Sequence, residues 1–374
     1  FQPDFVCVTG DLAFSGRKEE YDEAGAFLSR LGENLELDPR SRFFLVPGNH
    51  DVDRKATRLT AGLREEIDAE NAGGFLADAS TWTTFAQRQK EFLAFTRSFL
   101  GEDRAWKAEQ PWRTEVIEID GVRVAILCLN SAWACQDDHD HEEIMLGEYQ
   151  IRHALARADE QAADLKIALF HHPFEDLKVF DRSRSRAVLL APNGAQFLLR
   201  GHLHETALAG GFTPSAEAFE FAAGACWQDA KWPHSVLCVQ IDPENGTGTV
   251  HAWTYSPRDG GFWSPDTRNY QGMKGGTWDF KLPESWAIHV GPPMEAAAGP
   301  LIPEPYRRFL TRTCGFLEPL LQAKQPLVFR LQDVYVPLDT DWIEPEKKNR
   351  GKAGELSGAT VSGEESASAR RPLA

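Results

Sequence analysis

Four short motifs in this sequence combine residue types that bind metal ions in proteins. They are Gly10-Asp11, Gly48-Asn49-His50-Asp51, His171-His172-Pro173 and Gly201-His202-Leu203-His204. Carboxylate, amide and imidazole ligands together suit Mn, Fe, Zn or Ni better than Ca, which takes oxygen ligands alone. No two cysteines have metal-binding spacing, so thiolate ligands are not expected. The motifs therefore predict a site for borderline divalent metals.

The segments before these motifs are expected to be buried parallel strands. They are short, apolar and rich in β-branched or aromatic residues, and they cover residues 4–9, 41–46, 166–170 and 195–200. The carboxyl ends of such strands are where open α/β sheets bind their ligands. A glycine in three of the motifs lets the backbone turn and approach an ion or a phosphate. We therefore expect the polar residues of all four motifs at one edge of a sheet.

In this order, the motifs resemble the binuclear metal site of the calcineurin-like metallophosphoesterases. The resemblance covers roughly residues 1–285 and implies an α/β fold with four layers, α/β/β/α, built around two mixed sheets. The metal ligands that it implies are Asp11, Asn49, His171, His202 and His204. Asp11 would bridge two divalent ions, with manganese the expected metal and Fe, Zn or Ni the alternatives. The choice between His171 and His172 stays open, although His171 follows the strand directly and keeps the family's His-x-Pro pattern.

The resemblance also assigns catalytic roles to His50 and Asp51. Held by Asp51, His50 would protonate or stabilise the leaving oxygen of the substrate, while a hydroxide between the two metals attacks phosphorus in line. The sequence around Gly10-Asp11 is similar to the branch of the family that includes cyclic-nucleotide phosphodiesterases. A phosphodiester is therefore the expected substrate, either a cyclic nucleotide or a nucleic acid.

One motif of the family is missing from this sequence. An Asp-x-His motif on the first strand precedes the Gly-Asp motif in the family, and here Phe1 stands only nine residues before Gly10. We expect the chain to be a fragment, with that strand encoded upstream. The alternative is a degenerate site, in which case the domain would be an inactive interaction module.

Composition predicts a cytoplasmic protein without a membrane partner. Hydrophobic residues make up 42% of the sequence, and apolar runs such as residues 122–129 are too short to cross a bilayer. Six scattered cysteines favour a reducing compartment over a disulfide scaffold. The net charge of −16 disfavours non-specific binding of nucleic acid, although bound dications reverse the charge locally.

Several other segments carry structural expectations. Helices are expected at residues 18–31 and 148–162 and through most of an aromatic-rich insertion at 52–105, and a β-hairpin at 115–130. Residues 219–221, 235–241 and 249–255 should form the second sheet of the sandwich. Residues 136–143 look like a metal cluster but follow no strand, so they are expected to be an exposed acidic loop. Arg182, Arg184 and Arg186 are expected in a solvated loop, or as a rim that steers phosphate.

The C-terminal part differs in character from the rest. Residues 286–343 are expected to form a connector with a helix at 303–321 and a strand at 327–338, and residues 344–374 a low-complexity flexible linker. The connector resembles the segment before the NTPase module of bacterial NACHT-type and related STAND proteins. It implies that the phosphoesterase is the effector of a longer chain, with antiviral defence as one role. An NTPase module after Ala374 would be its partner, and the full-length protein would act as a homo-oligomer.

Overall fold

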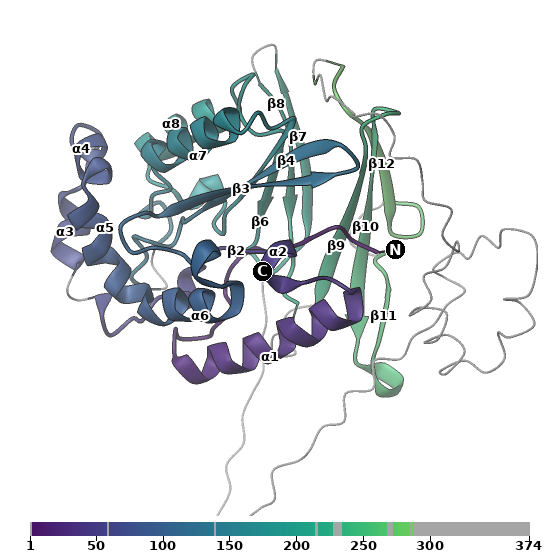
Figure 1. Cartoon of the computed structure of the whole chain (residues 1–374), viewed down its shortest axis with the longest axis horizontal. Coiled ribbons are helices and arrows are strands. Elements are labelled where there is room, and N and C mark those ends of the chain that lie inside the picture. The colour runs from purple at the N-terminus through teal and green to yellow at the C-terminus, as the bar shows by residue number, and fades with distance from the viewer. Residues whose placement is uncertain are drawn as a thin grey trace, which may run out of the picture. The chain divides into compact units, whose positions relative to one another are not determined.

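A computed structural model of the protein describes residues 2–57, 60–137, 140–213, 216–226, 234–267, 272–284 and 286 (Figure 1). The connector expected at residues 286–343 lies outside the described residues, apart from residue 286. The linker expected at residues 344–374 also lies outside them. None of the helices in the described part of the chain combines the length and the apolar character that a bilayer crossing requires.

A six-stranded mixed sheet forms the centre of the described fold. Its strand order is β3-β4-β5-β6-β8-β7. The strands are β3 (Trp112–Ile119), β4 (Val122–Leu129), β5 (Leu165–Leu169), β6 (Phe197–Arg200), β7 (Ala207–Thr213) and β8 (Ala216–Ala222). The four inner strands run parallel, and the two edge strands are antiparallel to their neighbours. The expected hairpin is confirmed, because β3 and β4 pair along their whole length across Asp120-Gly121.

Two further groups of strands lie over this sheet. Strands β1 (Val6–Val8) and β2 (Phe43–Leu45) form a parallel pair. A four-stranded antiparallel sheet has β10 at its centre, and its members are β9 (Ser235–Asp242), β10 (Thr247–Ser256), β11 (Phe262–Pro265) and β12 (Thr277–Lys281). The segments 235–241 and 249–255 thus lie in a second sheet, as expected.

The placement expected for residues 219–221 was wrong. They belong to β8, which joins the first sheet by parallel pairing with β6, so that Phe219 lies opposite Phe197 and Phe221 opposite Leu199. The alternating pattern of these residues indicates a half-buried strand, but it does not say to which of the two sheets the strand belongs. Pairing with β6 places these residues in the first sheet, and Phe280 of β12 packs over them from the second sheet, with its ring centre 4.4 Å from that of Phe219.

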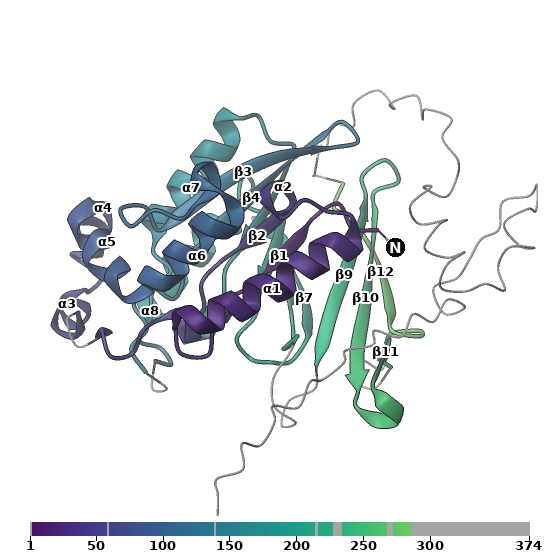
Figure 2. The same ribbon diagram turned by 60° about the horizontal axis from the view of Figure 1, so that its bottom comes forward.

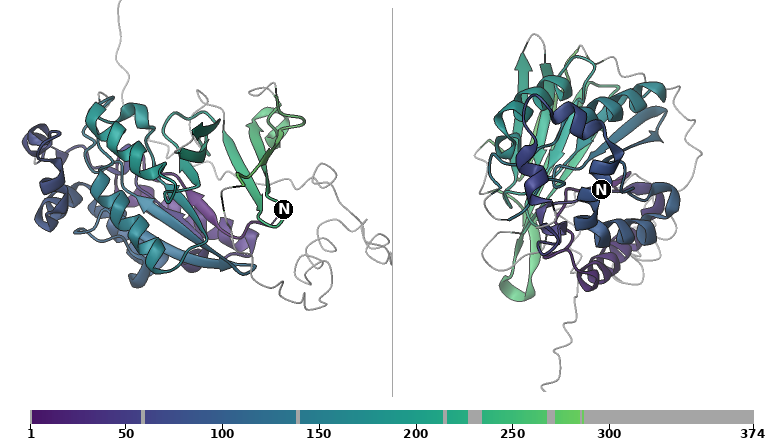
Figure 3. Two further views of the ribbon diagram at one scale, coloured as in Figure 1. Left: turned by 90° about the horizontal axis from the view of Figure 1, so that it is seen from above. Right: turned by 90° about the vertical axis from the view of Figure 1, so that its left-hand side faces the viewer.

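Alternating side chains on β4 separate the two layers that cover the central sheet. Ala125, Leu127 and Leu129 face helices α7 (Glu148–Glu160) and α8 (Val179–Leu189). Val124, Ile126 and Cys128 share the opposite core with β2 and with β10 and β12. Helices α1 (Lys18–Leu35) and α6 (Lys90–Leu100) cover that core from outside, and α1 runs along β1 and β2 (Figures 2 and 3). The expected α/β fold with layers α/β/β/α is confirmed.

The insertion at residues 52–105 is helical, as expected, and much of it packs around a small core of its own. Helices α3 (Ala61–Glu66), α4 (Ala72–Ala77) and α5 (Ala79–Ala86) lead into α6 (Figure 1). Trp82 and Phe85 each meet the ring of Trp133 edge-on, with centroids 4.9 Å apart. Ile67, Leu76 and Met145 complete this cluster. The aromatic stripe is therefore core, and Trp133, Ala134 and Met145 are built into it.

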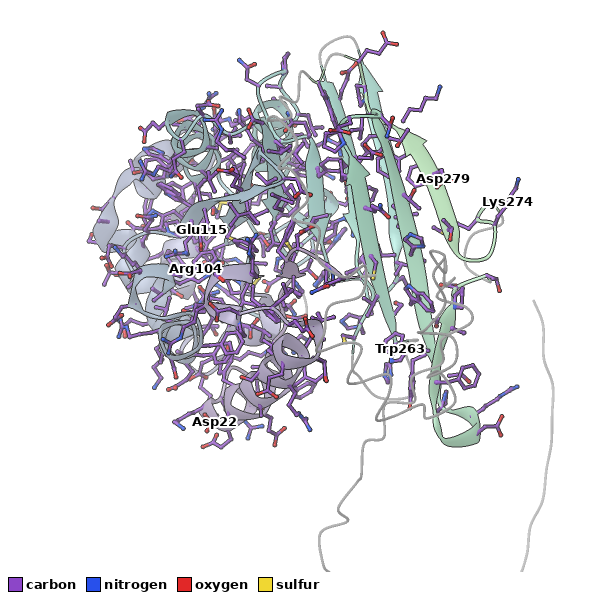
Figure 4. All side chains as sticks on the ribbon, turned by 45° about the vertical axis from the view of Figure 1, so that its right-hand side comes forward. Asp22, Arg104, Glu115, Trp263, Lys274 and Asp279 are labelled. Carbon is purple, nitrogen blue, oxygen red and sulfur yellow. The ribbon has the colours of Figure 1, made fainter. Side chains whose placement is uncertain are left out.

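Arg104 fixes the position of β2, the strand that leads to the Asn-His-Asp motif. The residue lies on η4 (Glu102–Arg104) and forms an ion pair with Glu115 of β3, and Figure 4 shows the two side chains together. Its guanidinium also donates to the carbonyl oxygen of Arg40 in α2 (Pro39–Arg42), at 2.7 Å, and to that of Phe43, at 2.9 Å. The guanidinium of Arg104 thus ties β2 to β3, at the edge of the central sheet.

Candidate metal centre

The four motifs all follow the carboxyl ends of parallel strands. Asp11 comes after β1, and Asn49, His50 and Asp51 form the 3-10 turn η1 (Asn49–Asp51) after β2. His171 follows β5, and His202 follows β6. Positive φ angles at Gly10, Asp11, His202 and His204 mark the sharp turns that bring these residues off the strands.

Four ligand atoms from the four motifs meet at one point. Nε2 of His171 lies 3.1 Å from Oδ2 of Asp11 and 3.1 Å from Oδ1 of Asn49. Nδ1 of His202 lies 3.0 Å from the same Asn49 oxygen and 3.3 Å from the His171 nitrogen. Ligands bonded to a divalent ion at about 2.0–2.2 Å are about 3 Å from each other, so these separations are those of a coordination shell.

An orphaned carboxylate oxygen supports the presence of a cation here. Oδ2 of Asp11 is buried and has no hydrogen-bond partner. Oδ1 accepts the backbone N–H of His50 at 2.9 Å. Burial works against ionisation, but His171 and then His50 hold the pKa of Asp11 well below its usual value. A buried anionic oxygen without a donor is costly, so the residues present fit a metal ion that faces it.

The backbone of β1 sets the tautomer of His171. Nδ1 of this ring lies 2.6 Å from the carbonyl oxygen of Thr9, which can only accept, so Nδ1 carries a proton. The neutral ring therefore presents the lone pair of Nε2 to Asp11 and Asn49. Burial alone would lower the pKa of His171, but attraction to Asp11 raises it above the usual value.

His172 is held differently, although its ring lies close to those of His171 and His202. The Ser131 hydroxyl oxygen accepts the backbone N–H of His171 at 3.2 Å and that of His172 at 3.1 Å. Its own hydrogen is then left for Nδ1 of His172, 2.9 Å away. The proton of the His172 ring therefore sits on Nε2, which faces Sγ of Cys135 at 3.6 Å. Both ring nitrogens are engaged, and this pattern favours His171 over His172 as the ligand.

Asp51 organises the backbone around the centre. Oδ1 accepts from the N–H of Ala13 at 3.0 Å and from the Tyr21 hydroxyl at 2.9 Å. Oδ2 accepts from the N–H of Leu12 at 3.2 Å and from that of Gly48 at 2.8 Å. The expected support of His50 by Asp51 is not how this ring is held, because Nδ1 of His50 bonds the carbonyl oxygen of Phe14 instead, at 2.8 Å. A direct catalytic role for Asp51 stays a prediction.

His204 lies two residues beyond His202 on left-handed backbone, with φ 57°. Burial lowers the pKa of His202 to about 4, and the charges of His171 and, more weakly, His204 add to this shift. His204 is thus near His202, but the shell formed by the other four atoms does not include it. Its role as a ligand stays a prediction.

Asp176 was not predicted as a site residue, and His141 was predicted only as part of an exposed acidic loop. Asp176 ends the 3-10 turn η5 (Phe174–Asp176), and its Oδ2 lies 3.3 Å from Nε2 of His202. Its Oδ1 lies 2.6 Å from Nδ1 of His141. His141 belongs to the segment 136–143 and is exposed, as expected, but it is not a free loop residue. Only the position of Asp176, five residues after His171, could have drawn attention to it.

The three arginines expected in a loop lie on helix α8. Arg182 pairs with Glu142 at 2.9 Å, and Arg186 lies 3.9 Å from Glu175. The guanidinium of Arg184 lies 5.7 Å from the centre of the Phe180 ring. Leu189 of the same helix packs against the central sheet, and this burial accounts for the helix that the polar sequence obscured.

The chain is 20% identical over 288 residues to the "Uncharacterized metallophosphoesterase-like protein YydB" of Bacillus subtilis (strain 168), a match that covers 75% of this chain. The chain spans 57% of the length of that relative. Among solved structures, Vps29 of Chaetomium thermophilum matches 46% of this chain and 60% of its own, with 8% identity and a TM-score of 0.20.

The family described as "Calcineurin-like phosphoesterase" matches residues 1–206, more than half of the chain. The matched region contains all four motifs and every residue of the shell described above. Members of this family are hydrolases that act on phosphoesters and typically use two divalent metals. This chain belongs to the calcineurin-like phosphoesterase family.

Proposed function

We propose that this chain is a cytoplasmic phosphodiesterase that uses two divalent metal ions. The observation that supports this best is the meeting of Asp11, Asn49, His171 and His202 at one point, with a buried oxygen of Asp11 left unsatisfied. Manganese is the first choice of metal, and Fe, Zn and Ni suit the same mixture of ligands.

The residues of the chain would bind the metal, orient its ligands and move protons. Asp11, Asn49, His171 and His202 would hold one metal, and Thr9 fixes the ring of His171. When bound, divalent ions supply Lewis acidity at the phosphoryl group and a nucleophile derived from water. His50 would give a proton from Nε2 to the leaving oxygen as the P–O bond breaks. Throughout the reaction, Nδ1 would keep its own proton, which is hydrogen-bonded to the carbonyl oxygen of Phe14.

The other metal would be held by His204, by Asp11 as a bridge, and by an Asp-x-His pair on a further strand. Among the described strands, β1 pairs with β2 alone, and the proposed strand would pair with the other edge of β1. We therefore propose that the gene encodes an apolar strand ending in Asp-x-His upstream of Phe1.

The substrate is proposed to be a cyclic nucleotide, with nucleic acid as the second candidate. The resemblance of the Gly10-Asp11 region to cyclic-nucleotide phosphodiesterases and the net charge of −16 favour the small substrate. Residues 286–343 support a second part of the proposal, because they resemble the segment that precedes a NACHT-type NTPase module. The phosphoesterase would then be the effector of a STAND protein, with a defence role, activated when the full-length chain assembles into a homo-oligomer.

One assay series tests the proposal. The full gene product and residues 1–374 are each incubated with Mn²⁺ and bis(p-nitrophenyl) phosphate, cyclic nucleotides, plasmid DNA or RNA. We expect Mn-dependent hydrolysis of the aryl diester, and of a cyclic nucleotide in preference to nucleic acid. Asp11→Ala should abolish it. If the full gene product binds metal but hydrolyses none of these substrates, the domain is an interaction module instead.

The link to an NTPase has its own test. The reading frame after Ala374 should contain Gly-x-x-x-x-Gly-Lys-Ser/Thr within a few tens of residues. Turnover per site should also be higher in the triggered full-length protein than in residues 1–374. A reading frame that stops near Ala374, or equal turnover, would leave a free-standing phosphoesterase.

A further inference from the structure

Asp176 stands between two histidines from different parts of the chain. Its Oδ1 lies 2.6 Å from Nδ1 of His141, and its Oδ2 lies 3.3 Å from Nε2 of His202. The carboxylate side chain is mostly buried, with 12% of its surface exposed, whereas 70% of the His141 side chain is exposed. A chain of polar groups therefore runs from the surface to the metal centre.

The ring of His202 needs an acceptor on the side away from the metal. Its Nδ1 faces Asn49 and His171, so a neutral ring that offers this lone pair to an ion must carry its proton on Nε2. The Asp176 oxygen that lies 3.3 Å from that nitrogen is buried and has no hydrogen-bond partner. The N–H at Nε2 of His202 therefore needs an acceptor, and Oδ2 of Asp176 needs a donor, so each can supply what the other requires. Carboxylates in this position fix the tautomer and orientation of metal-binding histidines.

The backbone around His202 makes this support more necessary. His202 adopts φ 74°, a conformation that is rare for residues with a side chain. In the following turn, the N–H of Leu203 bonds the carbonyl oxygen of Gly201 at 3.0 Å. A short, strained turn of this kind is costly to hold, so a contact at the far end of the ring adds restraint where it is needed.

Asp176 and His141 are themselves held in place. The N–H of Asp176 bonds the carbonyl oxygen of Pro173 at 3.2 Å, which keeps the carboxylate on the turn after the His171 motif. The residues on either side of His141 are each held by an arginine. Asp140 pairs with Arg64 of α3, and Glu142 pairs with Arg182 of α8 at 2.9 Å. His141 is therefore presented to Asp176 by a braced segment.

We propose that Asp176 is a positioning residue for the metal centre, which orients His202 and is in turn held by His141. The inference rests on the proposed metal centre and assigns to the segment around His141 a task beyond the four motifs. Asp176 links the turns after β5 and β6, so that His171 and His202 keep their separation. His141 contacts the other carboxylate oxygen of Asp176, Oδ1, and so keeps the carboxylate from rotating away from His202.

Metal affinity measured without substrate tests this directly. Isothermal titration with MnCl₂ alone is applied to the wild-type chain, Asp176→Ala, Asp176→Asn and His141→Ala. Loss of a carboxylate that supports a metal-bound histidine lowers affinity about 10–100-fold, and we expect this for Asp176→Ala. Asp176→Asn keeps an acceptor and should recover part of the loss. His141→Ala should weaken binding by less than Asp176→Ala.

Two controls keep the test decisive. His153→Ala removes another exposed histidine, on α7, and should bind Mn²⁺ as the wild type does. Circular dichroism melts establish that each variant is folded, and if Asp176→Ala does not fold, the exposed His141 variant carries the test. Wild-type affinity in folded Asp176→Ala, or in folded His141→Ala when only that variant is available, overturns the inference. Because no turnover is measured, a protein that binds Mn²⁺ without hydrolysing phosphodiesters would refute the proposed function and leave this inference standing.

Discussion

Nδ1 of His50 donates to the carbonyl oxygen of Phe14 at 2.8 Å, and the two rings are stacked, with centroids 5.3 Å apart and planes inclined by 25°. The carbonyl can only accept, so this bond fixes a proton on Nδ1 and leaves Nε2 to exchange a proton with a substrate. Phe14 exposes 74% of its surface, yet the loop that carries it is firmly held. Asp51 accepts the N–H of Ala13, and Glu20 accepts that of Ser15 at 2.9 Å.

His50→Ala is expected to keep its metal and lose its rate. The ring supplies a proton but does not belong to the shell of ligand atoms, so the turnover number should fall by about two to four orders of magnitude. Metal content of the purified variant and its turnover of bis(p-nitrophenyl) phosphate are the two measurements. Loss of metal from the His50 variant would show that the ring is a ligand and would refute this role.

Phe14→Ala should slow the reaction modestly without unfolding the protein. The hydrogen bond to His50 comes from the backbone and survives, but the ring loses a stacking contact worth about 0.5–1.5 kcal/mol. We expect a decrease in turnover of roughly 2- to 10-fold and a melting temperature lowered by only a few degrees, because the removed ring is largely exposed. Phe14→Tyr, which keeps the stack, serves as the matched control and should behave as the wild type.

Asp11→Asn should abolish metal binding but not weaken the metal-free fold. The amide keeps the acceptor for the His50 N–H, and it places a donor where the orphaned oxygen faces Nε2 of His171. Affinity for Mn²⁺ should fall by more than the about 10–100-fold that a supporting residue costs. Thermal melts in a chelator should place the variant at or above the wild type, because active-site strain is relieved. A lower metal-free melting temperature would contradict this.

Gly48→Ala should damage the centre through packing alone. A Cβ at residue 48 would overlap Oδ1 of Asp11 and come within 2.6 Å of its backbone nitrogen. Asp11 must then move, and we expect Mn²⁺ affinity and turnover to fall at least about tenfold, since small displacements at a reacting centre cost about that much or more. Gly62→Ala is the control, because nothing lies within 4 Å of a Cβ there and the helix gains about 0.5–1 kcal/mol.

Asp181 should contribute more to the stability of the metal-free protein at mildly acidic pH than at neutral pH. Burial raises the pKa of Asp181 to about 6, despite the N–H donors of Leu146 and Gly147. The folded state then keeps a proton that the unfolded chain, with an ordinary pKa of about 3.9, releases between about pH 4 and 6. Its contribution to the free energy of unfolding therefore falls as pH rises through that window, by at most about 3 kcal/mol.

The measurement for Asp181 is a pair of denaturant titrations at pH 4.5 and 7, each with wild type and Asp181→Asn in a chelator. Other carboxyl groups titrate in both proteins, so the difference between the two isolates Asp181. The wild type should lose stability relative to the variant as pH rises. An equal difference at the two pH values would mean that the carboxyl is already ionised throughout.

Sequence patterns located the metal centre because its residues follow strands whose apolar runs are recognisable. Asp11, Asn49, His171 and His202 are each tied to a strand end, so finding the strand places the side chain. Asp176 and His141 have no such marker, since their contact joins residues 35 positions apart. The choice between His171 and His172 likewise rests on Ser131, a residue some 40 positions away that no local pattern connects to them.

The same limit explains the errors in the fold. The hairpin of β3 and β4 and the strands β9 and β10 were predictable because their partners are neighbours in sequence. The partner of β8 is β6, and Phe219 meets Phe197 only after the chain has turned back along β7. Helix α8 was hidden because two of its three buried residues, Asp181 and Ser185, are polar, and only Leu189 is apolar.

The small core around Trp133 has a consequence for how such proteins diverge. Trp133 and Met145 flank the segment that carries His141, and both are buried by residues of the inserted helices α3, α4 and α5. A descendant that lost those helices would expose the Trp133 ring and would also lose Arg64, the α3 residue that pairs with Asp140. We therefore expect two segments to occur together in relatives of this chain, or to be absent together. They are the insertion after the Asn-His-Asp motif and the segment around His141.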